Sequence, residues 1–375
     1  MTWLAATGDF AAHGGMDRAN YALASWLAGH GRDVHLVAHR VAADLAARPE
    51  VTVHGVPRPF GAHLVGAPLL ARAARRVRRR LPRRAGVLMN GGNGVDGAPT
   101  WVHYLHAAYA PEVAVSIRTR VSASLGRRYY LAREAAALAT APLVICNSAT
   151  TAADVQRCYG VPAAKTRVVY YGIDAALFAP VREDERRAAR AALRLPDDLP
   201  VAIFIGALGD RRKGFDRLFE AWRSLSSGGR WDAALIVVGA GVEQAHWAAR
   251  AQAAGLKGVQ VLGFRTDVPQ LLAAADLLVH PSRYEAYGLG VHEAICRGLP
   301  AIVSAGAGIA ERFPPELAPL VLPAGAGTDE VAAALRRWHA DPAAWRRHAA
   351  PLSATLRARG WDEMAADIAE AVEAA

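Results

Sequence analysis

Residues 281–300, with the sequence PSRYEAYGLGVHEAICRGLP, limit the fold of this chain more than any other segment. The apolar residues 274–280 just before them predict a short buried strand, which the Pro-Ser pair would end. From about Leu289 onward the residues favour a helix that Gly298 and a nearby proline close. A buried strand that leads directly into a helix is typical of an α/β domain.

Two glutamates, Glu285 and Glu293, stand eight residues apart in this segment, with Gly288 and Gly290 between them. Glycines at the start of a helix let a ligand approach the backbone, and the free N–H groups and the helix dipole favour an anion there. Because Glu293 lies one turn into the helix, its carboxylate suits hydroxyl groups such as those of a ribose. Glu285 would face the other end of the same ligand. The alternative is a surface helix with two solvated glutamates.

This spacing resembles the E-x7-E signature of the retaining GT-B glycosyltransferases of family 4, the glycosyl transferases group 1. The matching positions are Ser282, Glu285, Gly288, Leu289, Glu293, Ala294, Gly298 and Pro300, while Tyr287 stands where phenylalanine is usual. The resemblance implies that the amides of residues 288–290 meet the donor diphosphate and that Glu293 holds the nucleotide ribose. It also implies that Glu285 faces the donor sugar. The implied donor-binding set in this segment is therefore Tyr287, Gly288, Leu289, Gly290 and Glu293.

Residues 207–214 form a second candidate site, a basic loop between an apolar strand (200–206) and a helix that starts at Phe215. Cationic side chains in such a loop suit a leaving diphosphate, whose negative charge grows as the sugar bond breaks. Lys213 and the glycine after it match the family pattern, but Ala207 occupies the usual arginine position. We take Arg212 as the substitute, with a solvated basic loop as the alternative.

Residues 259–263 read as another strand, and Phe264 and Arg265 follow it. Family members often hold the nucleotide base by backbone contacts at this position. The resemblance therefore adds Phe264 and Arg265 to the donor-binding set, and a simple loop is the alternative.

The chain begins with a β-α-β pattern: a strand at 3–6, a loop with Gly14 and Gly15, a helix, and a strand at 34–38. The absence of G-x-G-x-x-G argues against a dinucleotide dehydrogenase. In the resembling family a glycine-rich loop here faces the donor diphosphate, and Gly14 and Gly15 match it. A tight turn without a ligand is the alternative.

Residues 100–106, TWVHYLH, predict an alternating strand that ends in His103 and His106. Such a strand would place the two histidines on opposite faces, and no Cys or carboxylate lies near them, so we expect no metal site. The resemblance places a donor-sugar histidine at the end of this strand. His106 is the better match, and a core or surface histidine is the alternative.

Residues 68–84 carry eight arginines, all within Arg72–Arg84. As a helix they could contact an anionic membrane or lipid phosphate, whereas the alternative is a solvated helix face. The formal net charge of +10 does not decide between these interpretations. We expect no nucleic-acid partner, because the cluster has neither interleaved aromatic residues nor a base-reading motif.

A chain of 375 residues is too long for one ordinary domain and suits two. The resemblance predicts the GT-B fold, two Rossmann-like domains that face each other across a cleft, with ligands at the carboxyl ends of the strands. We expect an acceptor-side domain at 1–175, joined by a terminal helix at 361–375, and a nucleotide-sugar domain at 176–360, with the linker at about 173–182.

We also expect a cytoplasmic protein, with peripheral contact to the inner face of the membrane as a further interpretation. The sequence has no apolar run of membrane-spanning length and no signal-peptide pattern. Its three cysteines lack paired or metal-type spacing.

The implied activity is that of a retaining hexosyltransferase, which moves a sugar from a UDP- or GDP-sugar to a hydroxyl of a glycan, a lipid-linked molecule or a secondary metabolite. We assign the catalytic roles to His106, Arg212, Lys213 and Glu285. No D-x-D motif is present, so we expect no metal, and no cofactor beyond the substrate. Acceptor contacts are expected in the loops 57–67 and 90–99. A relative that hydrolyses or epimerises nucleotide sugars, or a basic nucleic-acid-binding protein, is the alternative.

Overall fold

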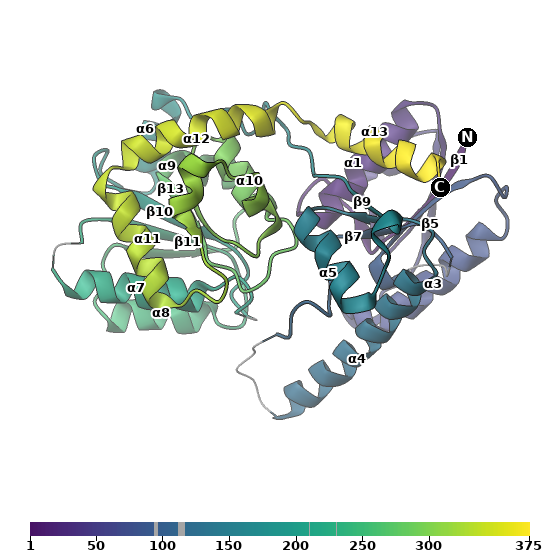
Figure 1. Ribbon diagram of the computed structural model, residues 1–375, viewed down its shortest axis with the longest axis horizontal. Helices are drawn as coiled ribbons and strands as arrows, with labels where there is room; N and C mark the ends of the chain where they lie inside the picture. Colours follow the sequence, from purple (N-terminus) through teal and green to yellow (C-terminus); the bar gives the residue numbers. More distant parts are fainter. Residues whose placement is uncertain (94–96, 112–116, 210, 230) are drawn as a thin grey trace. The chain divides into compact units, whose positions relative to one another are not determined.

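The computed structural model describes residues 1–93, 97–111, 117–209, 211–229 and 231–375, and Figure 1 shows its helices and strands. The chain divides into two compact units. The first contains residues 1–110, 117–172 and 359–375, and the second contains Ile173–Ala358. Positions 94–96 of the predicted acceptor loop 90–99 and Asp210 of the basic loop lie outside the described residues.

Among the described residues, the first unit holds a parallel sheet of seven strands in the order β5-β3-β1-β6-β7-β8-β9. The strands are β1 (Thr2–Ala6), β3 (Asp33–Ala38), β5 (Val51–Gly55), β6 (Gly86–Asn90), β7 (Thr100–Val102), β8 (Val144–Cys146) and β9 (Thr166–Val168), with a separate short pair of β2 (Asp9–Phe10) and β4 (Arg40–Val41). The helices are α1 (Met16–Gly29), α2 (Ala43–Ala46), α3 (His63–Arg78), α4 (Ile117–Thr140), α5 (Ala149–Tyr159) and α13 (Trp361–Glu373).

The described part of the second unit holds a parallel sheet of six strands in the order β12-β11-β10-β13-β14-β15. The strands are β10 (Val201–Ile205), β11 (Ala234–Val238), β12 (Val259–Gly263), β13 (Leu277–His280), β14 (Ala301–Ser304) and β15 (Val321–Leu322). The helices are α6 (Glu183–Ala192), α7 (Phe215–Ser227), α8 (Gln244–Ala253), α9 (Val268–Ala274), α10 (Leu289–Cys296), α11 (Thr328–Ala340) and α12 (Pro342–Arg357).

Both sheets are parallel, so the predicted α/β class is confirmed. The central strands β1, β10, β11 and β13 are almost entirely buried, which explains why they are near-continuous apolar runs. Because all strands of a sheet point the same way, the loops that follow them gather at one edge. This carboxyl edge is where parallel sheets bind ligands.

The terminal helix α13 packs on α1 and β6 within the first unit. Its apolar face is buried through Met364, Ala365 and Ile368. At its far end the Trp3 indole N–H donates to Glu373 at 3.2 Å. The end of the chain is therefore part of the core of the first unit.

The predicted strand over 100–106 is wrong beyond Val102, where β7 ends. The backbone N–H groups of His106 and Ala107 donate to the Glu134 carboxylate, at 2.9 and 3.3 Å. A side chain thus satisfies the donors that a neighbouring strand would otherwise satisfy. The predicted strand at 274–280 is also shorter, because Ala274 ends α9 and β13 begins at Leu277.

Candidate active site

The loops that follow β10 and β13 meet at the carboxyl edge of the second sheet. Gly214 makes this approach feasible, because its φ is +73° and a Cβ there would lie 1.9 Å from the carbonyl oxygen of Pro281. Only glycine fits both the left-handed backbone and the contact. Lys213, one residue earlier, is thereby held against the loop that precedes α10.

Arg283 fastens the two loops together. Its backbone N–H donates to the Arg212 carbonyl and its guanidinium donates to the Arg211 carbonyl, both at 2.8 Å. The same guanidinium makes a two-point pair with Asp216 at 2.7 and 2.6 Å. Planar, two-point pairs of this kind fix orientation as well as distance. The sequence analysis did not identify Arg283 or Asp216 as site residues. An acidic residue in the first turn of a helix that follows a basic loop, as Asp216 is in α7, could have indicated the pair.

The Glu285 carboxylate is the centre of the site, with its side chain 12% exposed. Its Oε2 atom forms an ion pair with the Lys213 ammonium and lies 3.1 Å from His280 Nε2. The Arg212 guanidinium lies 3.9 Å from the same oxygen. The structure therefore brings together three of the four predicted catalytic residues, and adds His280, the last residue of β13, which the sequence had not singled out.

Burial acts to raise the pKa of Glu285, but Lys213, the His280 hydrogen bond and Arg212 outweigh it and hold that pKa well below its ordinary value. The carboxylate is thus charged at any physiological pH. Burial also lowers the pKa of His280, against the opposing effect of its bond to Glu285. His280 is therefore expected to be neutral, which leaves Lys213 and Arg212 as the cations of the site.

Gly288 immediately precedes α10 and has a φ of +106°, and a Cβ there would lie 2.9 Å from Ile309 Cγ2. The loop before it is tied down, because the N–H groups of Gly308 and Ile309 donate to the carbonyls of Glu285 and Tyr287 at 3.1 and 2.7 Å. At Gly290 a Cβ would meet nothing within 4 Å. Gly290, in the first turn of α10, therefore borders open space. The first amides of a helix have no partner within the helix, which is what an anion site requires.

Tyr287 and Glu293 differ in exposure. The Tyr287 ring is buried and its hydroxyl lies 2.8 Å from His292 Nδ1, within the packing that holds α10. Its side chain is therefore part of the packing that positions α10. Glu293 is half-buried, one turn into α10.

Phe264 and Arg265 follow β12, which is separated from β13 by β11 and β10. Phe264 is 74% exposed, and Arg265 forms an exposed pair with Asp267 at 2.7 Å. They lie at the carboxyl edge of the same sheet as Glu285. The structure does not bring them into contact with the Glu285 cluster.

In the first unit, Gly14 and Gly15 are exposed and immediately precede α1, and Gly14 has a φ of +85°. The nearby Asp9 carboxylate is buried and accepts from Arg40 at 2.6 Å. Burial and the negative charge of Asp9 raise the pKa of Asp17, in the first turn of α1, to about 6. The glycine loop thus lies beside a charged cluster that the sequence did not predict.

His106 is half-buried in the first unit, and its ring stacks on Tyr130 with a centroid distance of 4.9 Å. Burial, with a smaller effect from Arg127, lowers the pKa of His106 to about 4. His103 bonds to the Tyr171 hydroxyl, and burial lowers its pKa to about 3. Both imidazoles are therefore neutral near pH 7, and His103 is half-buried beside Tyr171.

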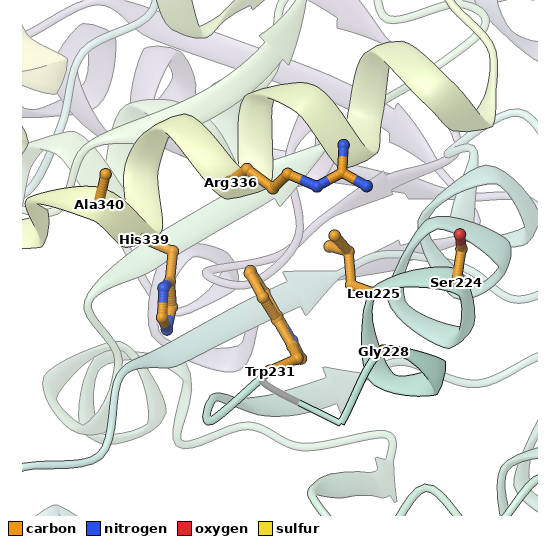
Figure 2. A pocket seen from close by; sticks show the side chains of 7 residues that line it. All are labelled: Ser224, Leu225, Gly228, Trp231, Arg336, His339 and Ala340. Carbon is orange, nitrogen blue, oxygen red and sulfur yellow. The ribbon is translucent and has the colours of Figure 1, made fainter.

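A cavity of about 440 Å³ lies elsewhere in the second unit, between the last turns of α7 and α11. Figure 2 shows the Trp231 ring between His339 and Leu225, below Arg336. None of the predicted site residues lines it. Within the described ranges, no three His, Cys, Asp or Glu side chains are grouped to hold a metal ion, and no helix there is long and apolar enough to cross a membrane.

Two family profiles match the chain. The profile described as Glycosyltransferase Family 4 matches residues 13–177, and the one described as Glycosyl transferases group 1 matches residues 199–341. Among solved structures, the chain is similar to WaaG, a glycosyltransferase involved in lipopolysaccharide biosynthesis, with a TM-score of 0.76, 23% identity, and 98% and 99% of the two chains covered. It is also similar to HepE of Anabaena in complex with UDP and glucose, with a TM-score of 0.71, 21% identity and 100% of each chain covered.

Curated relatives match over shorter stretches. The lipopolysaccharide glucosyltransferase WaaG of Escherichia coli is 42% identical over 100 residues, which is 26% of each chain. The D-inositol 3-phosphate glycosyltransferase of Salinispora tropica is 33% identical over 227 residues, or 56% of this chain and 43% of the relative. The chain thus spans less than half the length of these two relatives.

Proposed function

The chain belongs to the glycosyl transferases of group 1, and from this premise we propose that it moves a sugar from a nucleotide diphosphate sugar to a hydroxyl acceptor, with retention at the anomeric carbon. One observation carries the proposal: the Glu285 carboxylate, Lys213 and Arg212 converge beside the open start of α10. That arrangement provides an anion-binding site with a negatively charged carboxylate beside it.

Lys213 and Arg212, together with the amides of residues 288–290, would hold the donor diphosphate. As the bond from sugar to phosphate breaks, negative charge grows on the diphosphate and positive charge on the sugar ring. The two cations stabilise the first charge, and the ionised Glu285 stabilises the second. The cost of reorganisation is small because Arg283 and Gly214 already fix both loops.

Four further residues complete the proposed roles. Glu293 would bind the ribose hydroxyls, and the backbone at Phe264 and Arg265 would bind the base. His106, neutral because its pKa is about 4, would orient the donor sugar by hydrogen bonding and not by donating a proton as an acid. The acceptor hydroxyl would pass its proton to the leaving phosphate. No metal or other cofactor is part of this proposal.

The second unit would bind the nucleotide sugar and the first unit the acceptor. UDP is the first nucleotide to test, because HepE was solved with UDP and glucose. The relatives' names point to lipopolysaccharide and to an inositol phosphate, so glycan, lipid-linked and small-molecule hydroxyls are the acceptor classes to screen. We further propose a cytoplasmic location, which fits three cysteines that are all free, and membrane contact through Arg72–Arg84.

A product assay tests the proposal. Candidate UDP- and GDP-sugars would be incubated with an acceptor panel, and the anomeric configuration of the product read by NMR. Transfer with retention supports the proposal. Release of free sugar at the same rate with and without acceptor would instead assign the chain to the hydrolysing class, and inversion would contradict the assigned mechanism.

A further inference from the structure

The turn Pro59–Gly61 and the first half of α3 expose apolar side chains to solvent. Phe60 is 99% exposed, and Leu64, Val65 and Leu69 are each more than a third exposed. Phe60 has a φ of +56°, a left-handed backbone that bulky residues rarely adopt. The turn therefore holds a large aromatic ring outward at a conformational cost, with no contact in the core to offset it.

The second half of α3 and the residues after it are basic. The exposed arginines are Arg72, Arg76, Arg79, Arg80, Arg83 and Arg84. No Asp or Glu occurs in the sequence from residue 51 to residue 95. Among the described residues, no ion pair involves these arginines. Their charge is therefore directed to solvent and not neutralised by the protein.

The opposite face of α3 is anchored. Leu70, Ala74 and Val77 are buried in a core cluster with Leu4 and Met89 of the central strands. In a helix, residues 65, 69, 72 and 76 fall on one stripe, at spacings of three and four. The fold therefore fixes one outward stripe that is apolar at its start and basic at its end.

We propose that this stripe is a membrane-docking surface for an anionic bilayer. We define the α3 docking surface as Phe60, Leu64, Val65, Leu69, Arg72, Arg76, Arg79 and Arg80. Phe60 and the three aliphatic residues enter the boundary between headgroups and acyl chains, while the arginines bind lipid phosphates. A bilayer accounts for both halves of the stripe. A second copy of the chain would oppose like charges, and a nucleic acid would leave the aliphatic residues unburied.

The position of the surface bears on the acceptor, and this step rests on the proposed function. A Cβ at Gly66, on α3, would lie 2.7 Å from the His39 ring and 3.3 Å from Arg58. Arg58 in turn lies 3.7 Å from the Asp9 carboxylate, which belongs to the cluster beside the Gly14–Gly15 loop. Docking through α3 thus brings the carboxyl edge of the first sheet near the bilayer. The acceptor class that fits is a lipid-borne hydroxyl.

Vesicle co-sedimentation tests the surface with the full chain and no nucleotide sugar. Vesicles of phosphatidylcholine alone would be compared with vesicles that also contain phosphatidylglycerol. The test variants are Phe60→Asn, which keeps a residue tolerant of positive φ, Leu69→Ser, and the triple variant of Arg76, Arg79 and Arg80→Gln. The matched controls in the second unit are the exposed Leu177→Ser and a triple variant of Arg187, Arg336 and Arg347→Gln.

We expect binding only to the anionic vesicles. The triple arginine variant should bind roughly a hundredfold more weakly, at about fivefold for each arginine. Phe60→Asn should weaken binding about tenfold, since the exposed ring is no longer buried in lipid. Both control variants should bind like the wild type, and all variants should keep the wild-type melting temperature.

Three outcomes would overturn the proposal: wild-type protein that does not bind anionic vesicles, test variants that bind as well as wild type, or control variants that lose as much binding as the test variants. Double-stranded DNA serves as a competitor. If DNA binds more tightly than the vesicles and Phe60→Asn leaves that binding unchanged, the surface is a nucleic-acid site. Because the vesicles contain no substrate, these outcomes are separate from the product assay of the transferase.

Discussion

The negative charge of Glu285 is already balanced by neighbouring side chains of the protein before any ligand binds. Lys213 is paired with it, His280 bonds to it, and Arg212 lies 3.9 Å away. A diphosphate at the start of α10 would therefore share cations with Glu285. The residue is suited to a positively charged sugar, because it remains ionised where an ordinary buried glutamate would take up a proton.

Substitution of Glu285 by Gln should lower kcat for transfer by roughly a hundredfold or more, because the shape is kept and the negative charge beside the sugar is lost. The measurement is steady-state transfer with the donor identified by the product assay. Glu220→Gln, a half-buried glutamate that pairs with Arg223 and Arg250 on the same unit, is the control. Equal kcat values for Glu285→Gln and wild type would remove Glu285 from the mechanism.

Asp17→Asn should stabilise the protein at high pH. The pKa of Asp17 is raised from 3.8 to about 6 in the folded state, so the folded state holds the proton more tightly. The wild type therefore has the same free energy of unfolding as the variant below pH 4. It becomes less stable than the variant as the pH rises through 6. After allowing for partial exposure, we expect a gain of about 1–2 kcal/mol at pH 8 and none at pH 4. Denaturant unfolding at the two pH values measures it; a gain that does not vary with pH would contradict the assigned cause.

At the scale of elements, the site depends on how closely two strand-to-helix loops approach. Gly214 lets them meet, and Arg283 joins them through Arg211, Arg212 and Asp216. The loops are therefore positioned by backbone geometry and one arginine, before any substrate contact.

Gly214→Ala should cost about 1–3 kcal/mol of stability and most of the transfer activity. A Cβ there meets the Pro281 carbonyl at 1.9 Å, so the loops must separate. Gly255→Ala is a matched control: its φ is +65°, but a Cβ there meets nothing within 4 Å. It carries the backbone strain without the clash. Chemical denaturation and transfer rates would be compared, and the same loss of activity in both variants would show that the loop contact is unimportant.

Elements with strong local signals could be predicted from the sequence. Strand β12 has the predicted bounds, and the terminal helix expected at 361–375 is present as α13, which ends at Glu373. The Ser148 side chain caps α5 by accepting the Thr151 N–H at 2.9 Å. Local sequence patterns do not predict the bounds of an element where contacts with residues distant in the sequence determine them. The strand beyond Val102 is replaced by bonds to Glu134, 28 residues away from His106.

The same limit applies to the site. Glu285, Gly288 and Lys213 could be proposed as site residues from the sequence because each belongs to a local motif in the loop where it lies. Arg283 and Asp216 are 67 positions apart, and their pairing arises only when β10 and β13 become neighbours. The aromatic position at 287 gave no indication of burial, because a tyrosine suits a ligand site and a core equally well.

At the scale of the molecule, the chain leaves its first unit at Gly172 and returns to it at Arg359. The returning helix α13 contributes buried side chains to a core that is otherwise built from the first half of the sequence. Stability of the first unit therefore depends on residues at both ends of the chain.

Ile368→Ala should destabilise the first unit by about 2–5 kcal/mol, because it removes a fully buried side chain from the packing of α13. Hydrogen exchange measured by mass spectrometry should show faster exchange in β1 and β6 and unchanged exchange in β10 and β11. Leu352→Ala, on α12, provides the reciprocal control in the second unit. Loss of protection in both units from Ile368→Ala alone would mean that the units do not fold separately.

Calorimetric titration of UDP and GDP in the presence of EDTA tests most directly whether the start of α10 is an anion-binding site. We expect one of the two nucleotides to bind the wild type without a divalent ion, and Lys213→Ala to weaken that binding at least tenfold, whereas the surface variant Lys257→Ala leaves it unchanged. Absence of binding by both nucleotides, or equal affinity in wild type and Lys213→Ala, would contradict the assignment of this site.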